Sequence, residues 1–527
     1  MKLNYKRTVY VGFAFFLICT FWQAYDTIIP KILTDKYGMN QANSGIIMAL
    51  DNILALFMLP LFGAISDRHF RKSGRRTPFI MVGTIVAVVL LVALSFVDNM
   101  QLKNISDVSA IDDPAALERL YDAEKDEKLL MPDPDPETGE QEFILAEKFP
   151  DKTAFTEIKS QVENAETKKM ETNKDYTNYV VPARQHYAQR VTHNNPKTLI
   201  LFIAVLLLLL IAMATFRSPA VALMPDVTIK PLRSKANAII NLMGTLGGAL
   251  VLVLGIVFST GAVKNSLMSY TTFFAIVAGI MLVCLLVFRL KVDEPRFVKE
   301  MEAESRKYGI DDGEESDGSD SRKLSSAERR SLLLILASVV LWFMGYNAVT
   351  SKYSVYATQV LARDYNTTLI IAQVTALIAF IPVGMLASKI GRKKTILIGI
   401  ILLAGSFAIA SSLRQNSSAL LMNILFALAG IGWATINVNS FPMVVELSRG
   451  SDVGRYTGFY YTASMAAQTV TPYLSGLLMD KAGNMYPLFP YAAVFVALSA
   501  VTMLFVRHGD SKPIPAKTKL EAFDVGD

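Results

Sequence analysis

The sequence predicts an all-α membrane protein with twelve transmembrane helices arranged as two six-helix repeats. Apolar residues make up 52% of the 527 residues and charged residues only 19%, and a soluble chain of this length usually carries more charge. Uncharged runs such as 198–214 approach the roughly 20 residues that span a bilayer, and runs of this length span it as helices. A basic turn at 63–78 returns in shorter form at 384–395, which indicates two related halves.

Twelve apolar runs can be placed in chain order, each a predicted membrane span. They cover residues 9–32, 43–65, 77–97, 198–222, 236–259, 270–290, 331–351, 367–388, 395–412, 419–445, 456–479 and 486–506. Lys2, Lys6 and Arg7 precede the first run as they would in a signal peptide. No small-residue cleavage pattern follows them, so we expect a retained first helix.

The distribution of positive charge predicts the orientation of the chain. With the N-terminus inside, the inner segments hold 31 Lys and Arg residues and the short outer loops hold 7. Because positive residues remain on the cytoplasmic side, we expect a multi-pass cell-membrane protein with both termini in the cytoplasm. The net charge of +6 therefore reflects topology and does not indicate a nucleic-acid partner.

The spans and the soluble segments divide the chain into six parts. These are transmembrane segments 1–97, an extracellular acidic insertion 98–197, transmembrane segments 198–290, a cytoplasmic linker 291–330, transmembrane segments 331–506 and a cytoplasmic tail 507–527. The insertion holds 21 acidic against 13 basic residues, and its apolar residues are sparse. We expect a solvated insertion; the alternative is a small external cap or a ligand-capturing module.

The two basic turns align on glycines. Gly63 corresponds to Gly384 and Gly74 to Gly391, with four extra residues in the first turn. A second correspondence supports this alignment, because an acidic residue follows nine positions after Arg217 and again nine positions after Asn437. Two parallel six-helix repeats around a central site is an architecture of secondary transporters.

The first turn also carries a motif. It reads Gly63-Ala-Ile-Ser-Asp67-Arg68, followed by Gly74-Arg75-Arg76-Thr-Pro78. This resembles the loop 2–3 signature of the major facilitator superfamily, and its spacing is similar to that of the sucrose/proton symporter branch and, more distantly, the glycoside–pentoside–hexuronide permeases. The resemblance covers the twelve spans but not the insertion. The second turn departs from the motif with Ser388 in place of Asp67, and the paired acids of the melibiose-type sodium site do not line up.

We expect these turns to form an inner gate. Gly63 allows helices to approach closely, while Asp67 is positioned to pair with an arginine or with a helix N-terminus of the other half, closing the inner mouth. The alternative is that the basic residues only set the topology. The residues predicted for the gate are Gly63, Asp67, Arg68, Arg71, Gly74, Arg75, Arg76, Asp226, Gly391, Arg392, Lys393 and Glu446.

Three charged residues within spans are candidates for proton coupling. Asp26 and Asp51 fall at similar depths in the first two spans, and Arg217 lies in the fourth. Charges inside the membrane are costly and mark functional sites, and two neighbouring acids in an apolar wall favour holding a proton. The alternatives are that the acids line the wet outer vestibule or cap a helix, and that Arg217 reaches the inner interface.

Polar and aromatic side chains at helical spacing suggest a binding site for a neutral sugar. Aromatic faces suit the C–H faces of a sugar, and amides donate and accept hydrogen bonds to its hydroxyls. Each amide is equally consistent with helix–helix contact. The candidates are Trp22, Gln23, Trp342, Tyr346, Asn347, Gln373, Asn423, Trp433, Asn437, Tyr461 and Gln468.

The sequence shows no phosphate-binding loop, no His-Glu-x-x-His zinc motif and no Gly-x-Ser-x-Gly nucleophile elbow, all of them enzyme or ATPase signatures. We therefore expect a transporter rather than an enzyme: a symporter of a neutral sugar, such as sucrose or a related glycoside, driven by the proton gradient without a cofactor. Two alternatives remain, an exporter of drugs or metabolites on the same fold and a non-transporting sensor that uses the external insertion.

Overall fold

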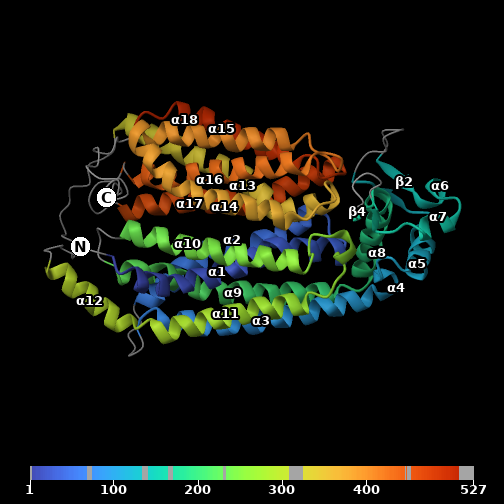
Figure 1. Cartoon of the computed structure of the whole chain (residues 1–527), viewed down its shortest axis with the longest axis horizontal. Helices are drawn as coiled ribbons and strands as arrows, with labels where there is room; N and C mark the ends of the chain where they lie inside the picture. The colour runs from blue at the N-terminus through green and yellow to red at the C-terminus, as the bar shows by residue number, and fades with distance from the viewer. Residues whose placement is uncertain are drawn as a thin grey trace.

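A computed structural model describes residues 3–67, 74–132, 141–163, 170–228, 233–307, 325–445, 447 and 453–509. Long helices of the first half are α1 (Tyr5–Lys31), α2 (Gln41–Asp67), α3 (Thr77–Asn104), α9 (Lys197–Asp226), α10 (Arg233–Val257) and α11 (Thr271–Lys291). Those of the second half are α13 (Ser326–Gln359), α14 (Tyr365–Ile390), α15 (Arg392–Ala410), α16 (Ala419–Val445), α17 (Val453–Ala482) and α18 (Leu488–Leu504). The two halves lie side by side along the long axis of the molecule (Figure 1).

Each predicted span falls on one of these helices, so the twelve-helix, all-α prediction is confirmed. Within the described residues, nine helices are long and apolar enough to cross a membrane, and α14 and α18 contain shorter apolar stretches. The protein is therefore a multi-pass membrane protein.

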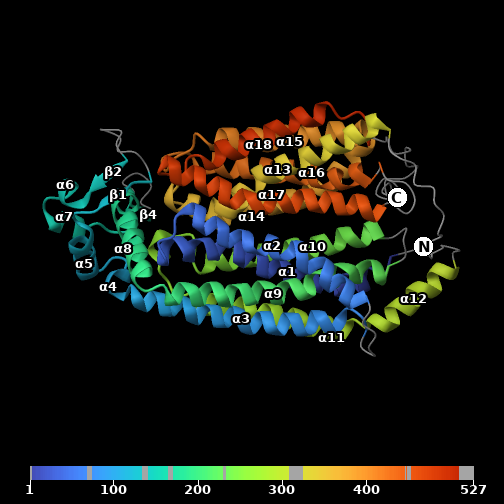
Figure 2. The same ribbon diagram turned by 180° about the vertical axis from the view of Figure 1, so that it is seen from behind.

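The helix contacts of one half are repeated in the other. The first helix packs against the fifth in both halves, as α1 against α10 and α13 against α17, and the third packs against the fourth, as α3 against α9 and α15 against α16. Between the halves, α2 contacts α17 and α10 contacts α14, which pairs the second helix of each half with the fifth of the other (Figure 2). This reciprocal pattern supports the internal repeat read from the two basic turns.

Glycines allow several of these helices to approach closely. A Cβ atom on Gly247 of α10 would lie 2.4 Å from the carbonyl oxygen of Phe16 on α1. In the second half, a Cβ on Gly432 of α16 would lie 2.8 Å from the carbonyl oxygen of Gly399 on α15. Small residues at such crossings are a common feature of helix packing in membranes.

The bundle has two distinct ends. We call one end of the bundle the termini end. Helix α1 begins there, α18 ends there, and α12 (Glu294–Lys307) lies there as well (Figure 1). The described residues between 105 and 196 (105–132, 141–163 and 170–196) project from the other end, the loop end, and we call them the loop-end unit. The unit contains α4 (Ser106–Ser109), α5 (Pro114–Glu124), α6 (Leu145–Lys148), α7 (Lys152–Thr156), a π-helical turn (Tyr176–Val180) and α8 (Val181–Asn194). Strand β1 (Lys128–Leu130) pairs antiparallel with β2 (Glu142–Ile144), and β3 (Gln161–Glu163) pairs antiparallel with β4 (Met170–Thr172).

The loop-end unit has a hydrophobic core of its own. Leu117 and Leu120 of α5, Phe155 of α7 and Tyr176 are fully buried in one cluster. Sparse apolar residues favour a solvated insertion, but the structure shows a folded unit with a core, which agrees with the alternative of a small module. Apolar residues that are sparse along the chain converge because short helices place them on a single face.

Contacts of α8 hold this unit on the first half of the bundle. Gly38 has a φ of 64°, and a Cβ there would lie 2.3 Å from the backbone nitrogen of Gln189 on α8. Gln185 Nε2 donates to Asp35 Oδ1 at 3.0 Å, in the π-helical turn Ile32–Lys36 that continues α1. Nearby, Lys36 and Asp98 form a buried ion pair at 2.7 Å. Gln101 Nε2 of α3 donates to Thr192 Oγ1 of α8 at 3.1 Å, so the unit is fixed to the ends of α1 and α3.

Candidate functional site

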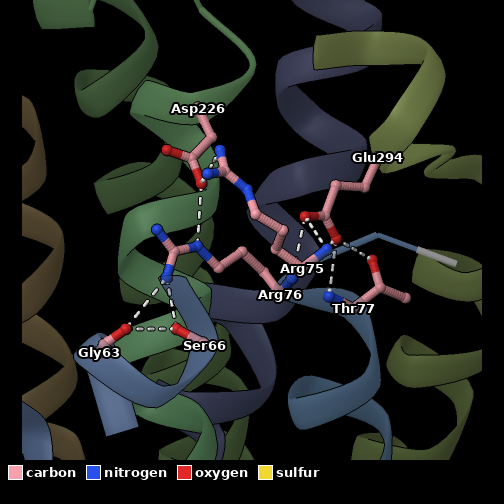
Figure 3. A network of polar contacts seen from close by, with 7 residues as sticks. All are labelled: Gly63, Ser66, Arg75, Arg76, Thr77, Asp226 and Glu294. Atoms are coloured by element: carbon pink, nitrogen blue, oxygen red, sulfur yellow. Dashed lines mark hydrogen bonds and ion pairs between the residues drawn. The ribbon is translucent and has the colours of Figure 1, made fainter. Parts of the chain in front are cut away.

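Two consecutive arginines before α3 tie together the ends of α2 and α9 at the termini end. Arg76 Nε donates to Asp226 Oδ2 at 2.9 Å, and Arg75 Nη2 lies 3.9 Å from the same oxygen. Arg76 Nη1 donates to the hydroxyl of Ser66 and, at 3.5 Å, to the carbonyl oxygen of Gly63 (Figure 3). The side chain of Arg76 is buried, so this ion pair is shielded from water.

Glu294, the first residue of α12, caps the N-terminus of α3. Its carboxylate accepts hydrogen bonds from the backbone N–H groups of Arg75 at 2.7 Å, Arg76 at 2.9 Å and Thr77 at 2.8 Å (Figure 3). It also accepts a hydrogen bond from the Thr77 hydroxyl at 2.8 Å, and Glu294 is only 2% exposed. A carboxylate at this position satisfies N–H groups that a helix leaves free and complements the helix dipole.

Gly74 is required by this arrangement. Its φ of 103° is one that side-chain-bearing residues rarely adopt, and a Cβ there would lie 2.2 Å from Glu294 Oε2. Gly391, its partner in the repeat, has a similar φ of 93°. The aligned glycines of the two basic turns therefore share a positive φ.

The structure describes some of the other predicted gate residues and leaves out the rest. Lys393 donates to the carbonyl oxygens of Leu504 at 2.8 Å and Val506 at 2.6 Å, which secures the end of α18, and Arg392 is buried. The Asp226 pairs join elements of the first half. Arg68, Arg71, Glu446 and the side chain of Asp67 lie outside the described part of the structure.

The three predicted proton-coupling residues lie within electrostatic range of one another. Asp26 lies ten residues before the end of the turn at Lys36, and Asp51 ten residues after the start of α2 at Gln41. At ~1.5 Å per residue, both lie about 15 Å from the loop end. Asp26 interacts electrostatically with both Asp51 and Arg217, and Asp51 also interacts with Arg217. These three residues, on α1, α2 and α9, form what we call the central charge cluster.

Arg217 is directed toward α1. Its guanidinium lies 5.3 Å from the ring centre of Trp22, within the range of a cation–π contact. The arginine is also within electrostatic range of Tyr461 on α17. Trp22 and Arg217 therefore connect the charge cluster to aromatic residues.

An amide pair bridges the two halves beside this cluster. Gln373 Nε2 on α14 donates a hydrogen bond to Gln23 Oε1 on α1. Two buried polar atoms nearby, Gln373 Oε1 and Trp22 Nε1, have no hydrogen-bond partner within the described residues. Buried polar atoms left unpaired cost free energy, so these two are an available acceptor and donor for a ligand or water.

An aromatic pair from the second half completes the central region. Tyr346 on α13 and Trp433 on α16 stack with ring centres 3.7 Å apart and planes 3° apart. Tyr346 is within electrostatic range of Asp26. The flat pair and the charge cluster thus belong to the same neighbourhood although they come from different halves.

The remaining predicted binding residues are more scattered. Trp342 is fully buried in the hydrophobic core of the second half. The Asn347 amide donates to the carbonyl oxygen of Phe343 on its own helix at 2.8 Å. Asn437 and Tyr461 are exposed, whereas Asn423 and Gln468 are half-buried.

Hydrogen bonds between the halves run from the centre to the loop end in the described part of the chain. Besides the glutamine pair, the Thr260 and Tyr365 hydroxyls are 2.7 Å apart and Asn366 Nδ2 donates to Thr260 Oγ1 at 3.2 Å. Asp480 of α17 accepts from the backbone of α2 at Gln41 and Ala42. The two halves are therefore closed against each other at the loop end.

Sequence reasoning missed Glu294 and Asp480. Each is an acidic residue at the end of a predicted span or just beyond it, as Asp226 is. Glu294 directly precedes Pro295, a residue favoured in the first turn of a helix. That signal marks a helix start, but it gives no indication of which other helix the carboxylate would cap.

Comparisons with known proteins match most of the chain to the superfamily whose signature the first basic turn resembles. A family model described as Major Facilitator Superfamily matches residues 191–374 and 354–525, and one described as MFS/sugar transport protein matches residues 11–104. An uncharacterised MFS-type transporter of Methanocaldococcus jannaschii is 32% identical over 127 residues, which is 24% of this chain and 30% of that relative.

Solved structures of transporters share the fold. The inward-open xylose transporter XylE from E. coli matches 98% of this chain and 99% of its own with a TM-score of 0.56 and 14% identity. The nucleoside transporter NupG matches 96% of this chain and 100% of its own with a TM-score of 0.52 and 12% identity. Together with a superfamily model that covers more than half of the sequence, the fold establishes that this chain belongs to the major facilitator superfamily of membrane transporters.

Proposed function

We propose that the protein is a secondary active transporter that carries a neutral sugar, such as sucrose or a related glycoside, together with a proton by alternating access. The observation that carries this proposal is the juxtaposition of the central charge cluster with the Gln23–Gln373 pair, which spans the two halves. A solved structure with the same fold is that of a D-xylose-proton symporter.

The chemistry of the central region suits a polyhydroxylated, uncharged substrate. The stacked Tyr346–Trp433 pair offers an apolar face, and the unpaired atoms Gln373 Oε1 and Trp22 Nε1 offer one acceptor and one donor. A sugar has C–H faces for the first and hydroxyls for the second. Because Gln23 and Gln373 lie on different halves, a substrate bound between them would sense their relative movement.

The central charge cluster provides a proton site. Two neighbouring carboxylates repel each other when both are ionised, which favours a proton on one of them, and a nearby arginine favours its release. Asp26, Asp51 and Arg217 have this arrangement. Since interacting acids titrate as a pair, the proton belongs to the two aspartates jointly.

The network around Arg76 is proposed to act as part of the cytoplasmic gate, with the termini end facing the cytoplasm. It locks α2, α3, α9 and α12 into one rigid group. Rocking of one half against the other then moves this group as a body. Asp67, at the last position of α2, is proposed to contact the other half when this end closes. We expect Asp67→Asn to reduce uptake while leaving membrane insertion intact; normal uptake by this variant would contradict the role.

The coupling role is tested by separating exchange from accumulation in proteoliposomes. Asp26→Asn and Asp51→Asn are expected to abolish sugar accumulation driven by an imposed proton gradient, while gradient-free exchange of internal for external sugar persists. Asp107→Asn, an exposed residue of the loop-end unit, is the matched control and should retain both activities. Full gradient-driven accumulation by both Asp26→Asn and Asp51→Asn would reject proton coupling through these residues.

A further inference from the structure

The first turn of α2 is held by two charged residues of the opposite half. Asp480 on α17 accepts hydrogen bonds from the backbone N–H groups of Gln41 at 2.9 Å and Ala42 at 2.7 Å. Lys352 on α13 is fully buried, and its ammonium donates to the carbonyl oxygen of Gln41. Asp480 and Lys352, an acid and a base of the second half, thus both bind the backbone of Gln41 in the first half.

These contacts complete the N-terminus of α2. The first four N–H groups of a helix have no partner within it. In α2 the first regular helical bond runs from the Ser44 N–H to the Asn40 carbonyl oxygen at 3.0 Å, and the N–H of Asn43 before it donates to Asn40 Oδ1 at 2.9 Å. Asp480 accepts from the N–H groups of Gln41 and Ala42, so two of these three free N–H groups are satisfied by the other half of the protein.

The backbones of the two helices touch at this point. A Cβ on Gly476 of α17 would lie 2.3 Å from the Gln41 carbonyl oxygen, and a Cβ on Gly45 of α2 would lie 2.2 Å from the Pro472 carbonyl oxygen. Neither glycine can be enlarged without moving the helices apart. The contact is close enough to seal the loop end between α2 and α17.

We propose that Asp480 and Lys352 form a latch that holds the loop end closed and releases when the loop end opens. The latch rests on the alternating access proposed above. Closing this end gives Asp480 two N–H partners and Lys352 a carbonyl partner. Opening this end removes all three hydrogen bonds. Asp480 and Lys352 then remain on the same half, where they interact electrostatically and neutralise each other. Asp480 and Asp67 have comparable positions at opposite ends of the bundle. Asp480 lies near the last residue of α17 at the loop end, and Asp67 is the last residue of α2 at the termini end.

The latch can be tested without knowing the substrate. In a background of Cys19→Ser and Cys284→Ser, a Ser44→Cys reporter lies buried beneath the latch, and a Ser95→Cys reporter lies in the core of the first half. A membrane-impermeant maleimide is applied from the side of the loop-end unit. Asp480→Asn, Lys352→Met and Gly476→Ala are expected to raise the labelling rate of Ser44→Cys about tenfold, the effect of losing a typical helix cap. The rate at Ser95→Cys should not change.

Lys481→Gln, an exposed neighbour of Asp480, is the matched control and should leave both rates unchanged. Unchanged labelling of Ser44→Cys in Asp480→Asn and Lys352→Met would overturn the proposal, as would an equal rise at both reporters, which would indicate general loosening. Neither result depends on sugar or proton transport, so failure of the latch is distinguishable from failure of the proposed substrate and coupling ion.

Discussion

At the scale of single residues, Glu294 and Gly74 show how closely the termini-end network depends on side-chain identity. The carboxylate of Glu294 occupies the space in which any side chain at position 74 would begin. It also replaces the N-terminal cap that α3 lacks, since Arg76 makes no side-chain capping bond there. One buried acid therefore fixes both the turn and the start of the helix.

We expect Glu294→Ala to destabilise the protein by about 1–2 kcal/mol, the usual cost of removing a helix cap. Thermal unfolding of the purified transporter measures the effect. Glu302→Ala, an exposed position on the same helix, should leave the unfolding midpoint unchanged. Equal midpoints for both variants would show that the cap contributes nothing.

Gly74→Ala should also lower stability, because the new Cβ adopts an unfavourable φ of 103° and meets Glu294. Gly405→Ala on α15 is the control, since a Cβ there meets no atom within 4 Å. In that helical position alanine should be neutral or stabilising. A Gly74→Ala protein with the wild-type unfolding midpoint would contradict the geometry.

At the scale of elements, the loop-end unit contains a buried acid shared by two bases on α8. Glu124 of α5 is fully buried and contacts His186 Nδ1 at 2.6 Å and Arg190 Nη2 at 2.6 Å. The hydrogen bond with Glu124 raises the pKa of His186 above its usual value, against the opposing effects of partial burial and Arg190, with Glu127 as a further acid nearby. This contact ties α5 to α8.

A raised pKa means that the folded unit binds the proton of His186 more tightly than the unfolded chain does. Its stabilising contribution is therefore complete below the unfolded pKa of about 6.5 and is lost as the pH rises through the higher folded value. Hydrogen exchange of α5 and α8 should accelerate over this range in the wild type. In His186→Gln this acceleration should disappear, while the exposed His193→Gln should retain it. A wild-type exchange profile that shows no such acceleration, once the intrinsic pH dependence of exchange is removed, would refute the role of His186.

The elements themselves followed from the sequence, whereas their contacts did not. Apolar runs such as 198–222 predict a helix because the bilayer imposes length and helicity on them, and α9 spans Lys197–Asp226. Glu294 and Asp480 cap helices that are distant in sequence, so only the packed structure identifies their partners. The sequence did not predict the core of the loop-end unit for a related reason, because its buried residues come from several short elements.

At the scale of the whole molecule, the candidate site was predicted in part. Asp26 and Asp51 were expected to be neighbours from their depths in the first two spans, and Asp26 interacts electrostatically with Asp51 in the structure. Arg217 was a separate candidate, and it interacts with both aspartates. Trp342 was grouped with Tyr346 by helical spacing, but it faces the core of the second half because spacing alone does not reveal which face of a helix meets the centre. The halves meet at the loop end through the latch and at the centre through Gln23 and Gln373.

Proton symport of a neutral sugar is the central claim, and medium pH tests it most directly. Sucrose or a related glycoside added to lightly buffered, energy-depleted cells that produce the protein should cause immediate alkalinisation of the medium. An uncoupler, or the paired substitution of Asp26 and Asp51 by Asn, should abolish the signal. Sugar uptake that proceeds at the full rate with no change in external pH would contradict proton coupling.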